Sequence, residues 1–220
     1  TKLEHAKEII AIANKKNLLI YEAFMYKHHE QFIRLKEILD HKIYGKARKV
    51  FINFGFPHLS KNDIRYSKEL DGGALFDAGA YTISAMNELF DYCEYESSNI
   101  DLEGNTVDIS GHAVFRTSGN VECFLNWGFG LGYKNEIQIW TNEQTIIVDR
   151  AFSKRPDDSA KIYTVKDGVI NADSSFSCNH FQRMFHFVCN LDRSKYLAAN
   201  NDLVNQMLKI DLMLKSIKNN

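Results

Sequence analysis

The fold of this chain is decided by four apolar segments that follow one another: TVDISGHAVF (106–115), NVECFLNWG (120–128), EIQIW (136–140) and TIIV (145–148). β-Branched and aromatic residues are frequent in them, which is typical of strands. Turn-forming residues lie between them at Ser118-Gly119-Asn120 and Asn142, and Gly104-Asn105 precedes the first segment. Consecutive strands joined by short turns indicate an antiparallel sheet.

Segments on both sides extend this sheet. Lys49–Phe56 alternates and predicts a strand whose one face is formed by Val50, Ile52 and Phe54. Lys161–Val165 and Gly168–Ile170 predict a hairpin around Asp167-Gly168.

Two amphipathic helices are expected near the end of the chain. The first is marked by Phe181, Met184, Val188 and Leu191, and the second by Leu203, Met207, Ile210 and Leu214. We interpret both apolar stripes as core faces. Because so few helices can cover only one face of a sheet, the predicted class is α+β, an open and mostly antiparallel sheet with helices on one face.

The first residues show a different pattern. Leu3, Ala6, Ile10 and Ala13 predict a helix, and Leu18–Tyr21 predicts a short buried strand after it. A helix followed by a strand is the last piece of a βαβ unit, and the chain contains no Gly-x-Gly-x-x-Gly. We therefore expect residues 1–27 to be the remnant of a truncated Rossmann domain and residues 28–220 to form a second domain.

Composition excludes several classes of function. A net charge of −1 gives no electrostatic basis for binding nucleic acid or an anionic membrane, and no apolar run is long enough to span a bilayer. The four scattered cysteines predict reduced thiols in a cytoplasmic protein. The cluster of Cys178, His180, His186 and Cys189 fits no zinc spacing, so no metal site is expected.

The stretch Gly72–Met86 is where chemistry is expected. Two glycines permit a tight turn, and Asp77 and Tyr81 follow at a spacing of four in a helical pattern, so both can point to one side. A phenol and a carboxylate placed there can donate a proton and orient a hydroxyl. In the alternative interpretation, Asp77 caps the helix and Tyr81 is a packing residue.

The pattern Gly-Gly-Ala-Leu-x-Asp-x-Gly-x-Tyr at 72–81, preceded by Phe54-Gly55-Phe56-Pro57 and Asp63-Ile64-Arg65-Tyr66, resembles the Gfo/Idh/MocA oxidoreductases. Within them it is most similar to ketoreductases acting at carbon 3 of nucleotide-linked 4-keto-6-deoxy sugars. The resemblance implies an NAD(P)-dependent enzyme that transfers hydride to or from a sugar or sugar nucleotide.

The same resemblance implies roles for individual residues. Tyr81 is the expected proton donor. The expected substrate-binding residues are Asp77, Arg65, Tyr66 and Gly73, and the expected cofactor-binding residues are Glu22, Tyr26 and Lys27. Lys27 stands where the family usually has arginine, and so lacks the bidentate fork.

The resemblance also places a catalytic lysine, in a Glu-Lys-Pro motif, before Thr1. NADP or NAD would be held mostly by a domain absent from this sequence, so we expect the fragment alone to be inactive. Two departures from the family pattern, Asp71 in place of a third glycine and Asn142-Glu143-Gln144 in place of a glycine turn, affect the pocket's shape.

Two other functions remain open at this stage. One is a dehydrogenase of a free sugar, polyol or dihydrodiol, and the other is a non-catalytic binding protein on the same scaffold. The strands carry apolar residues at both odd and even positions, such as Phe124, Trp127 and Phe129, so both faces of the sheet are apolar. Because the helices cover one face, we expect a homo-oligomer in which the other face of the sheet contacts a second copy.

Overall fold

The computed structural model describes residues 2–217. An eight-stranded sheet dominates it, in the order β2-β3-β4-β1-β5-β6-β7-β8. The strands are β1 (Ala47–Phe56), β2 (Cys93–Asp101), β3 (Ser110–Thr117), β4 (Glu122–Phe129), β5 (Lys134–Thr141), β6 (Thr145–Asp149), β7 (Ala160–Lys166) and β8 (Val169–Phe176). The helices are α1 (Leu3–Lys15), α2 (Glu30–Asp40), α3 (Ala80–Leu89), α4 (His180–Asn190) and α5 (Tyr196–Ile217).

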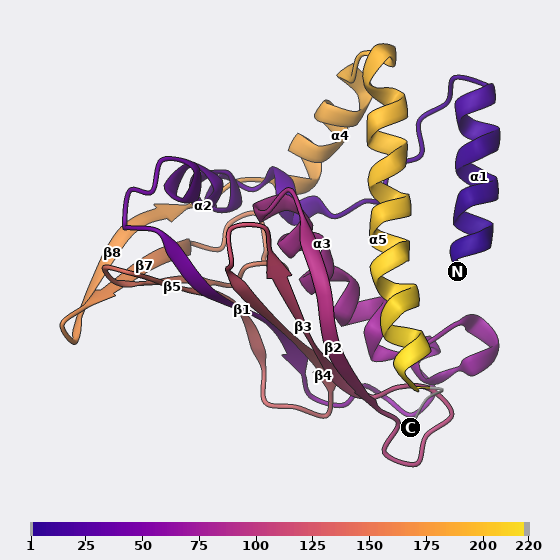
Figure 1. Ribbon diagram of the computed structural model, residues 1–220, viewed down its shortest axis with the longest axis horizontal. Coiled ribbons are helices and arrows are strands. Elements are labelled where there is room, and N and C mark those ends of the chain that lie inside the picture. The colour runs from indigo at the N-terminus through magenta and orange to yellow at the C-terminus, as the bar shows by residue number, and fades with distance from the viewer. Residues whose placement is uncertain (1, 218–220) are drawn as a thin grey trace.

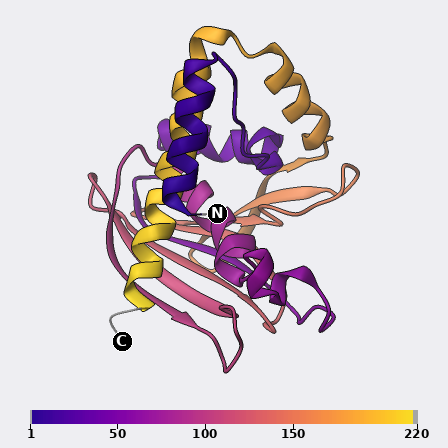
Figure 2. The ribbon, with the colours of Figure 1, turned by 90° about the vertical axis from the view of Figure 1, so that its right-hand side faces the viewer.

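The helices lie on one face of the sheet, as Figures 1 and 2 show. α1 and α5 run side by side, so the first and the last helix of the described residues share one layer. α3 packs directly against β1 and β4. The predicted α+β class, with an open sheet and helices on one face, is confirmed.

The sheet is antiparallel except at its centre. β1 pairs with β4 in parallel, Ile52 opposite Leu125, and with β5 in antiparallel orientation. The parallel pair arises because the chain leaves β1, crosses the sheet through α3, and returns by the hairpins β2–β3–β4. This crossover sets α3 over the middle of the sheet, where the candidate site lies.

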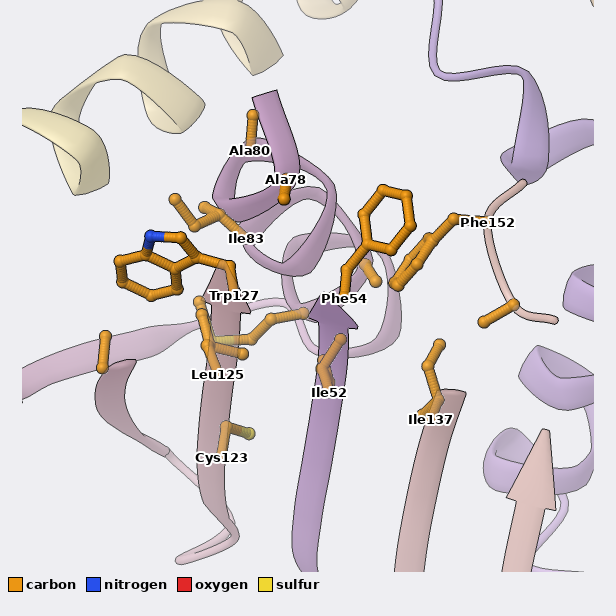
Figure 3. Packing of buried hydrophobic residues seen from close by; sticks show 14 of the residues in the cluster. Ile52, Phe54, Ala78, Ala80, Ile83, Cys123, Leu125, Trp127, Ile137 and Phe152 are labelled. Carbon is orange, nitrogen blue, oxygen red and sulfur yellow. The ribbon is translucent and has the colours of Figure 1, made fainter. Parts of the chain in front are cut away.

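Alternation along the strands separates a buried face from an open one. The helix-facing side chains of the central strands are fully or almost fully buried: Val50, Ile52, Phe54, Cys123, Leu125, Trp127, Ile137 and Ile139. Figure 3 shows Trp127 and Phe54 on either side of the turn that leads into α3. The predicted inward face of Val50, Ile52 and Phe54 is thereby confirmed.

Residues of the opposite parity form an aromatic cluster on the open face. The Phe51 and Phe124 rings are stacked at 5.0 Å, and Phe51 lies 4.8 Å from the Trp140 ring. Phe124, Trp127 and Phe129 suggested that both faces of the sheet are apolar. Only Phe124 lies on the open face, because Trp127 and Phe129 are buried in the core.

The N-terminal prediction is confirmed for the helix and wrong for the strand. α1 buries Leu3, Ala6, Ile10 and Ala13, but residues 18–21 form no strand, and Leu18 is exposed. A strand needs hydrogen bonds from a neighbour, and no described strand runs beside this segment.

Two strands of the sheet, β2 and β3, also differ from the prediction. β2 was not predicted, because its sequence CEYESSNID is largely polar and it lies at the sheet edge. The strand expected from Thr106 begins only at Ser110, because the Asp108 carbonyl oxygen accepts a hydrogen bond from Ala74 N and not from a neighbouring strand. The hairpin of β7 and β8 is confirmed, and its Asp167 and Gly168 have φ of 52° and 79°.

The first C-terminal stripe is only partly a core face. In α4, His180 and Met184 are buried, whereas Phe181, Phe185 and Phe187 are exposed. α4 lies beyond the sheet (Figure 1) and packs on the short helix Met25–His28, which covers only one side of it. The α5 stripe is a core face as predicted, with Met207 and Ile210 buried.

Within residues 2–217, no helix is both long enough and apolar enough to cross a membrane. In the same range, no three His, Cys, Asp or Glu side chains converge in a way that could hold a metal ion.

Candidate active site

The loop between β1 and α3 is built around Arg65. Asp63 caps the short helix Ile64–Tyr66 by accepting a hydrogen bond from the Arg65 backbone nitrogen at 3.0 Å. The guanidinium then contacts two carboxylates, with Nη1 3.2 Å from Asp63 Oδ1 and Nε 2.8 Å from Asp77 Oδ2. Burial lowers the Arg65 pKa, but both carboxylates raise it, and the net shift is upward.

The glycine pair allows this loop to lie directly against its own backbone. Gly73 N donates to the Arg65 carbonyl oxygen at 2.8 Å, and Gly72 N donates to the Ser67 carbonyl oxygen at 2.9 Å. A Cβ at position 72 would lie 2.5 Å from the Arg65 oxygen, and Gly73 has a φ of +125°. Larger residues would therefore displace the loop that holds Arg65.

The turn after the glycines is a π-helix, Leu75–Gly79, which continues into α3. It carries Asp77, and Tyr81 follows in the first turn of α3. Trp127 packs against Gly79, where a Cβ would lie 3.1 Å from the indole. Single π-helical turns within α-helices are frequent at functional sites.

Tyr81 lies in a box of aromatic rings. Its ring is 5.0 Å from Phe24, 5.4 Å from Phe54 and 5.7 Å from Phe152, between centroids. Its hydroxyl makes one weak contact within the described residues, donating to Met25 Sδ at 3.8 Å. A half-buried phenol with so weak a partner is free to donate to a bound molecule.

The electrostatic surroundings keep this phenol protonated. Burial raises the Tyr81 pKa above its usual value, the carboxylates of Asp77 and Glu22 raise it further, and Arg65 opposes them. The described residues therefore keep the Tyr81 hydroxyl protonated, and they do not ease the formation of phenolate.

The segment before α2 brings the Glu22 carboxylate close enough to act on Tyr81, and it places Lys27 over the Phe24 ring that packs on Tyr81. Burial raises the pKa of Glu22 to about 7, although Lys27 lowers it. Lys27 itself forms an ion pair with Glu88 of α3 at 2.9 Å. Tyr26 is fully buried and donates to Ser84 Oγ at 2.8 Å, so it supports this segment from within the core.

A polar cavity of about 360 Å³ opens beside this segment. Glu22 and Lys27 line it together with Ser84, Glu88 and Asp202 of α3 and α5. Glu22 thus has the cavity on one side, and its charge acts on Tyr81.

The structure brings together most of the residues proposed from the sequence, but it separates Tyr66 from them. The Tyr66 hydroxyl accepts from Leu59 N at 3.1 Å, and its ring packs 5.6 Å from Phe129. It lines a different cavity, of about 500 Å³, with His58 and Lys61. Gly73 shapes the site through its backbone, because its nitrogen is already bonded to the loop.

Sequence reasoning missed Asp108 and Phe152. Leu75 N donates to Asp108 Oδ2 at 2.6 Å, which ties the start of the π-helix to the segment before β3. An aspartate inside a predicted apolar strand was the available signal. Phe152 offered none, because it lies after the last of the four predicted strand segments, which ends at Val148.

Comparison with known proteins gives this geometry a context. The family profile described as the GFO/IDH/MocA C-terminal domain matches residues 32–147. The chain is 30% identical over 173 residues to dTDP-3,4-didehydro-2,6-dideoxy-alpha-D-glucose 3-reductase of Saccharopolyspora spinosa, covering 78% of this chain and 52% of that enzyme. It is 29% identical over 122 residues to trans-1,2-dihydrobenzene-1,2-diol dehydrogenase of Xenopus tropicalis, covering 54% and 37%.

The fold is also found in solved structures. The 3-ketoreductase KijD10 of Actinomadura kijaniata, in complex with NADP and TDP-benzene, superposes with a TM-score of 0.87 at 22% identity, covering 98% of this chain and 67% of that one. At this identity the likeness establishes the fold. The chain spans about half the length of the curated relatives it matches.

Proposed function

The chain belongs to the GFO/IDH/MocA family, and on that basis we propose that the full-length protein is an NAD(P)-dependent ketoreductase of nucleotide-linked sugars, acting at carbon 3 of a keto sugar. The observation that carries the proposal is the Tyr81 hydroxyl, held in an aromatic box where Asp77 and Arg65 act on it and where, among residues 2–217, its one hydrogen-bond partner is the Met25 sulfur. The 30% identity to a 3-reductase of a dTDP-linked sugar supports the substrate class.

Tyr81 acts as the general acid in this proposal. When bound, NADPH or NADH supplies the hydride, and the Tyr81 hydroxyl gives its proton to the sugar oxygen that becomes an alkoxide. The raised pKa of Tyr81 keeps the proton available at neutral pH. A cation beside the hydroxyl would stabilise the phenolate that remains, and the catalytic lysine that the family resemblance implies would meet that need.

Asp77 and Arg65 are the proposed substrate contacts. Asp77 has its second oxygen available to accept from a sugar hydroxyl while Arg65 fixes the first. Arg65 is 39% exposed and can share its remaining donors with a nucleotide phosphate, which a guanidinium recognises well. Tyr66 and Gly73 shape the loop on which Arg65 lies.

The residues proposed to contact a nicotinamide lie in the segment before α2. The Glu22 side chain makes no hydrogen bond or ion pair within the described residues, and with a pKa of about 7 it is partly protonated at neutrality. When protonated, the Glu22 carboxyl can donate a hydrogen bond to the oxygen of the uncharged nicotinamide carboxamide. Lys27, over the Phe24 ring at 5.4 Å, is the proposed contact to a phosphate of the cofactor, and buried Tyr26 orders this segment.

The proposal has consequences for organisation. Residues 1–27 belong to a dinucleotide-binding domain and residues 28–220 to a substrate-binding and oligomerisation domain. The open-face cluster of Phe51, Phe124 and Trp140 is the proposed contact between two copies of the chain. Four unpaired cysteines fit a reducing, cytoplasmic compartment.

The test is steady-state reduction of a dTDP-linked 3-keto sugar by the full-length protein, with NADPH and NADH compared. Turnover that depends on Tyr81 supports the proposal. The similarity to a dihydrodiol dehydrogenase supports a second candidate on the same site, the oxidation of a dihydrodiol or a free polyol. Turnover of that diol, with none of the nucleotide sugar, would favour the second candidate. No turnover of either would favour a non-catalytic binding protein.

A further inference from the structure

We propose that Asp108 is a positioning residue for this site: it fixes the glycine pair and the π-helical turn, and thereby sets where Asp77 and Tyr81 point. The inference rests on the proposed function for its catalytic consequence, and on the geometry of the described residues for its structural part.

Asp108 satisfies both backbone donors at the start of the turn. Its carboxylate Oδ2 accepts from Leu75 N at 2.6 Å, and its carbonyl oxygen accepts from Ala74 N at 2.9 Å. The first N–H groups of a helix have no partner within the helix. Here Asp108, 33 residues after Leu75, supplies the acceptors for these N–H groups. In most helices the side chain of a neighbouring residue has this role.

The carboxylate also fits against Gly73. A Cβ at position 73 would lie 2.1 Å from Asp108 Oδ1, so only a glycine leaves room for it. Gly73 N donates in turn to the Arg65 carbonyl oxygen, and Arg65 holds Asp77. Asp108 therefore touches the turn at the junction between the substrate loop and the π-helix.

Asp108 is buried enough for these contacts to be decisive. Burial raises its pKa, and the N–H group of Leu75 is the first of the donors that oppose this rise. The buried indole N–H of Trp127 approaches the same carboxyl, favouring its ionised form without the geometry of a full hydrogen bond. A carboxylate at the start of a helix is also favoured by the helix dipole.

The π-helical turn is the element that needs such support. Ala80 N reaches back five residues to Leu75 O, a wider turn than the α-helix forms. Asp108 holds its first end, and Trp127, packed on Gly79, holds its last. If the turn relaxed, Asp77 would lose its direction toward Arg65, and Tyr81 would rotate within its aromatic box.

The catalytic test compares Asp108→Ala, Asp108→Asn and Asp101→Ala in the full-length protein. Asp101 is a matched control, because its Oδ1 also accepts a backbone N–H, from Glu103 at 2.8 Å, away from the turn. We expect Asp108→Ala to lower kcat at least tenfold with the cofactor KM unchanged. Asp108→Asn keeps one acceptor for Leu75 N and should recover part of the loss, and Asp101→Ala should match wild type.

A second test needs no turnover. Amide hydrogen exchange of the folded full-length protein should become faster in residues 73–81 for Asp108→Ala, less so for Asp108→Asn, and stay unchanged for Asp101→Ala. In a Trp140→Phe background the emission of Trp127, then the only tryptophan in residues 1–220, should shift in the same order.

The two tests separate failure of this inference from failure of the proposed function. A folded Asp108→Ala protein with wild-type exchange in 73–81 overturns the inference whatever the activity. Faster exchange with an unchanged kcat also overturns it, because the turn would then not position the acid. If the wild type reduces no sugar, the proposed function fails while exchange still decides the structural part. If Asp108→Ala does not fold, Asp108→Asn carries both measurements.

Discussion

Arg65 Nε lies 2.8 Å from Asp77 Oδ2, so two residues that the sequence suggested as separate substrate contacts are partners of each other. The pair joins the loop before the glycines to the π-helical turn. Asp63 holds the same guanidinium from the other side at 3.2 Å. A bound phosphate would therefore meet an arginine whose direction is already fixed, which reduces the ordering that binding requires.

The charge of Asp77 should be visible in the pH dependence of turnover. Asp77 raises the Tyr81 pKa, and a general acid must be protonated, so reduction fails as the pH rises through that pKa. In Asp77→Asn the pKa falls, and the alkaline limb of kcat against pH should move to lower pH. Asp63→Asn is the control, because Asp63 also binds Arg65 but does not act on Tyr81. The alkaline limb of this variant should stay at the wild-type pH. An upward shift in Asp77→Asn would contradict the assignment.

Tyr81→Phe should separate chemistry from packing. The ring stays in its aromatic box, and in the described part of the chain the lost hydroxyl makes one hydrogen bond, a weak one to Met25 Sδ, so the melting temperature should hardly change. Loss of a general acid typically costs about 10²–10⁴ in rate. Cofactor affinity, measured by fluorescence titration, should be retained.

Tyr26→Phe is the matched control for that experiment. It removes a buried hydroxyl that donates to Ser84, which should cost stability of roughly 0.5–1.5 kcal/mol with little effect on turnover. If both variants lost activity only in proportion to stability, the structural interpretation of Tyr81 would be correct instead.

Gly73→Ala should destabilise the protein strongly. A φ of +125° is strained for alanine, and its Cβ would overlap Asp108 Oδ1. Backbone strain of this kind costs about 1–3 kcal/mol before the overlap is added. Gly132→Ala is the control, because no atom lies within 4 Å of its added Cβ. Urea unfolding of the pair should show a large loss for the first variant and about 0.5 kcal/mol or less for the second.

Two buried histidines should make the fold sensitive to acid. Burial, Lys154, His180 and Arg183 lower the pKa of His29 to about 3, and burial and Lys154 lower that of His180 to about 4. Between pH 4 and the usual histidine pKa of about 6.5, the unfolded chain binds protons that the folded chain does not. The free energy of unfolding should therefore fall as the pH drops through this window.

His29→Asn tests this origin without removing the helix cap. His29 Nδ1 accepts from Gln31 N at 3.1 Å, and an asparagine oxygen can accept the same bond. Urea unfolding between pH 4 and 7 should then show a shallower slope than in wild type. An unchanged slope would assign the acid sensitivity to other groups.

We expect copies of the protein to associate through the open face of the sheet. Trp140 is 44% exposed and packs on Phe51 there. Trp140→Lys should convert the full-length oligomer to a monomer in sedimentation velocity. Val169→Lys is the control, because Val169 is also apolar and 58% exposed but lies on the edge strand β8. A wild-type monomer at high concentration would refute the proposal.

Local patterns in the sequence were sufficient for much of this structure. Side chains alternate along a strand, so Val50, Ile52 and Phe54 had to share a face whatever strands lay beside them. The Asp167-Gly168 turn and the α1 stripe follow from equally local preferences. The strand expected at 18–21 failed for the complementary reason, because a strand also needs a partner.

Only the tertiary structure decided the contacts between distant residues. The parallel pairing of β1 with β4, the contact of Asp108 with Gly73 and the pair of Arg65 with Asp77 join segments that the sequence separates. Nothing local favours these contacts, since each forms only when the sheet has already brought both segments together. Local patterns in the sequence determined strand faces and turns, and long-range packing determined which side chains meet, because a contact between distant segments depends on the whole fold.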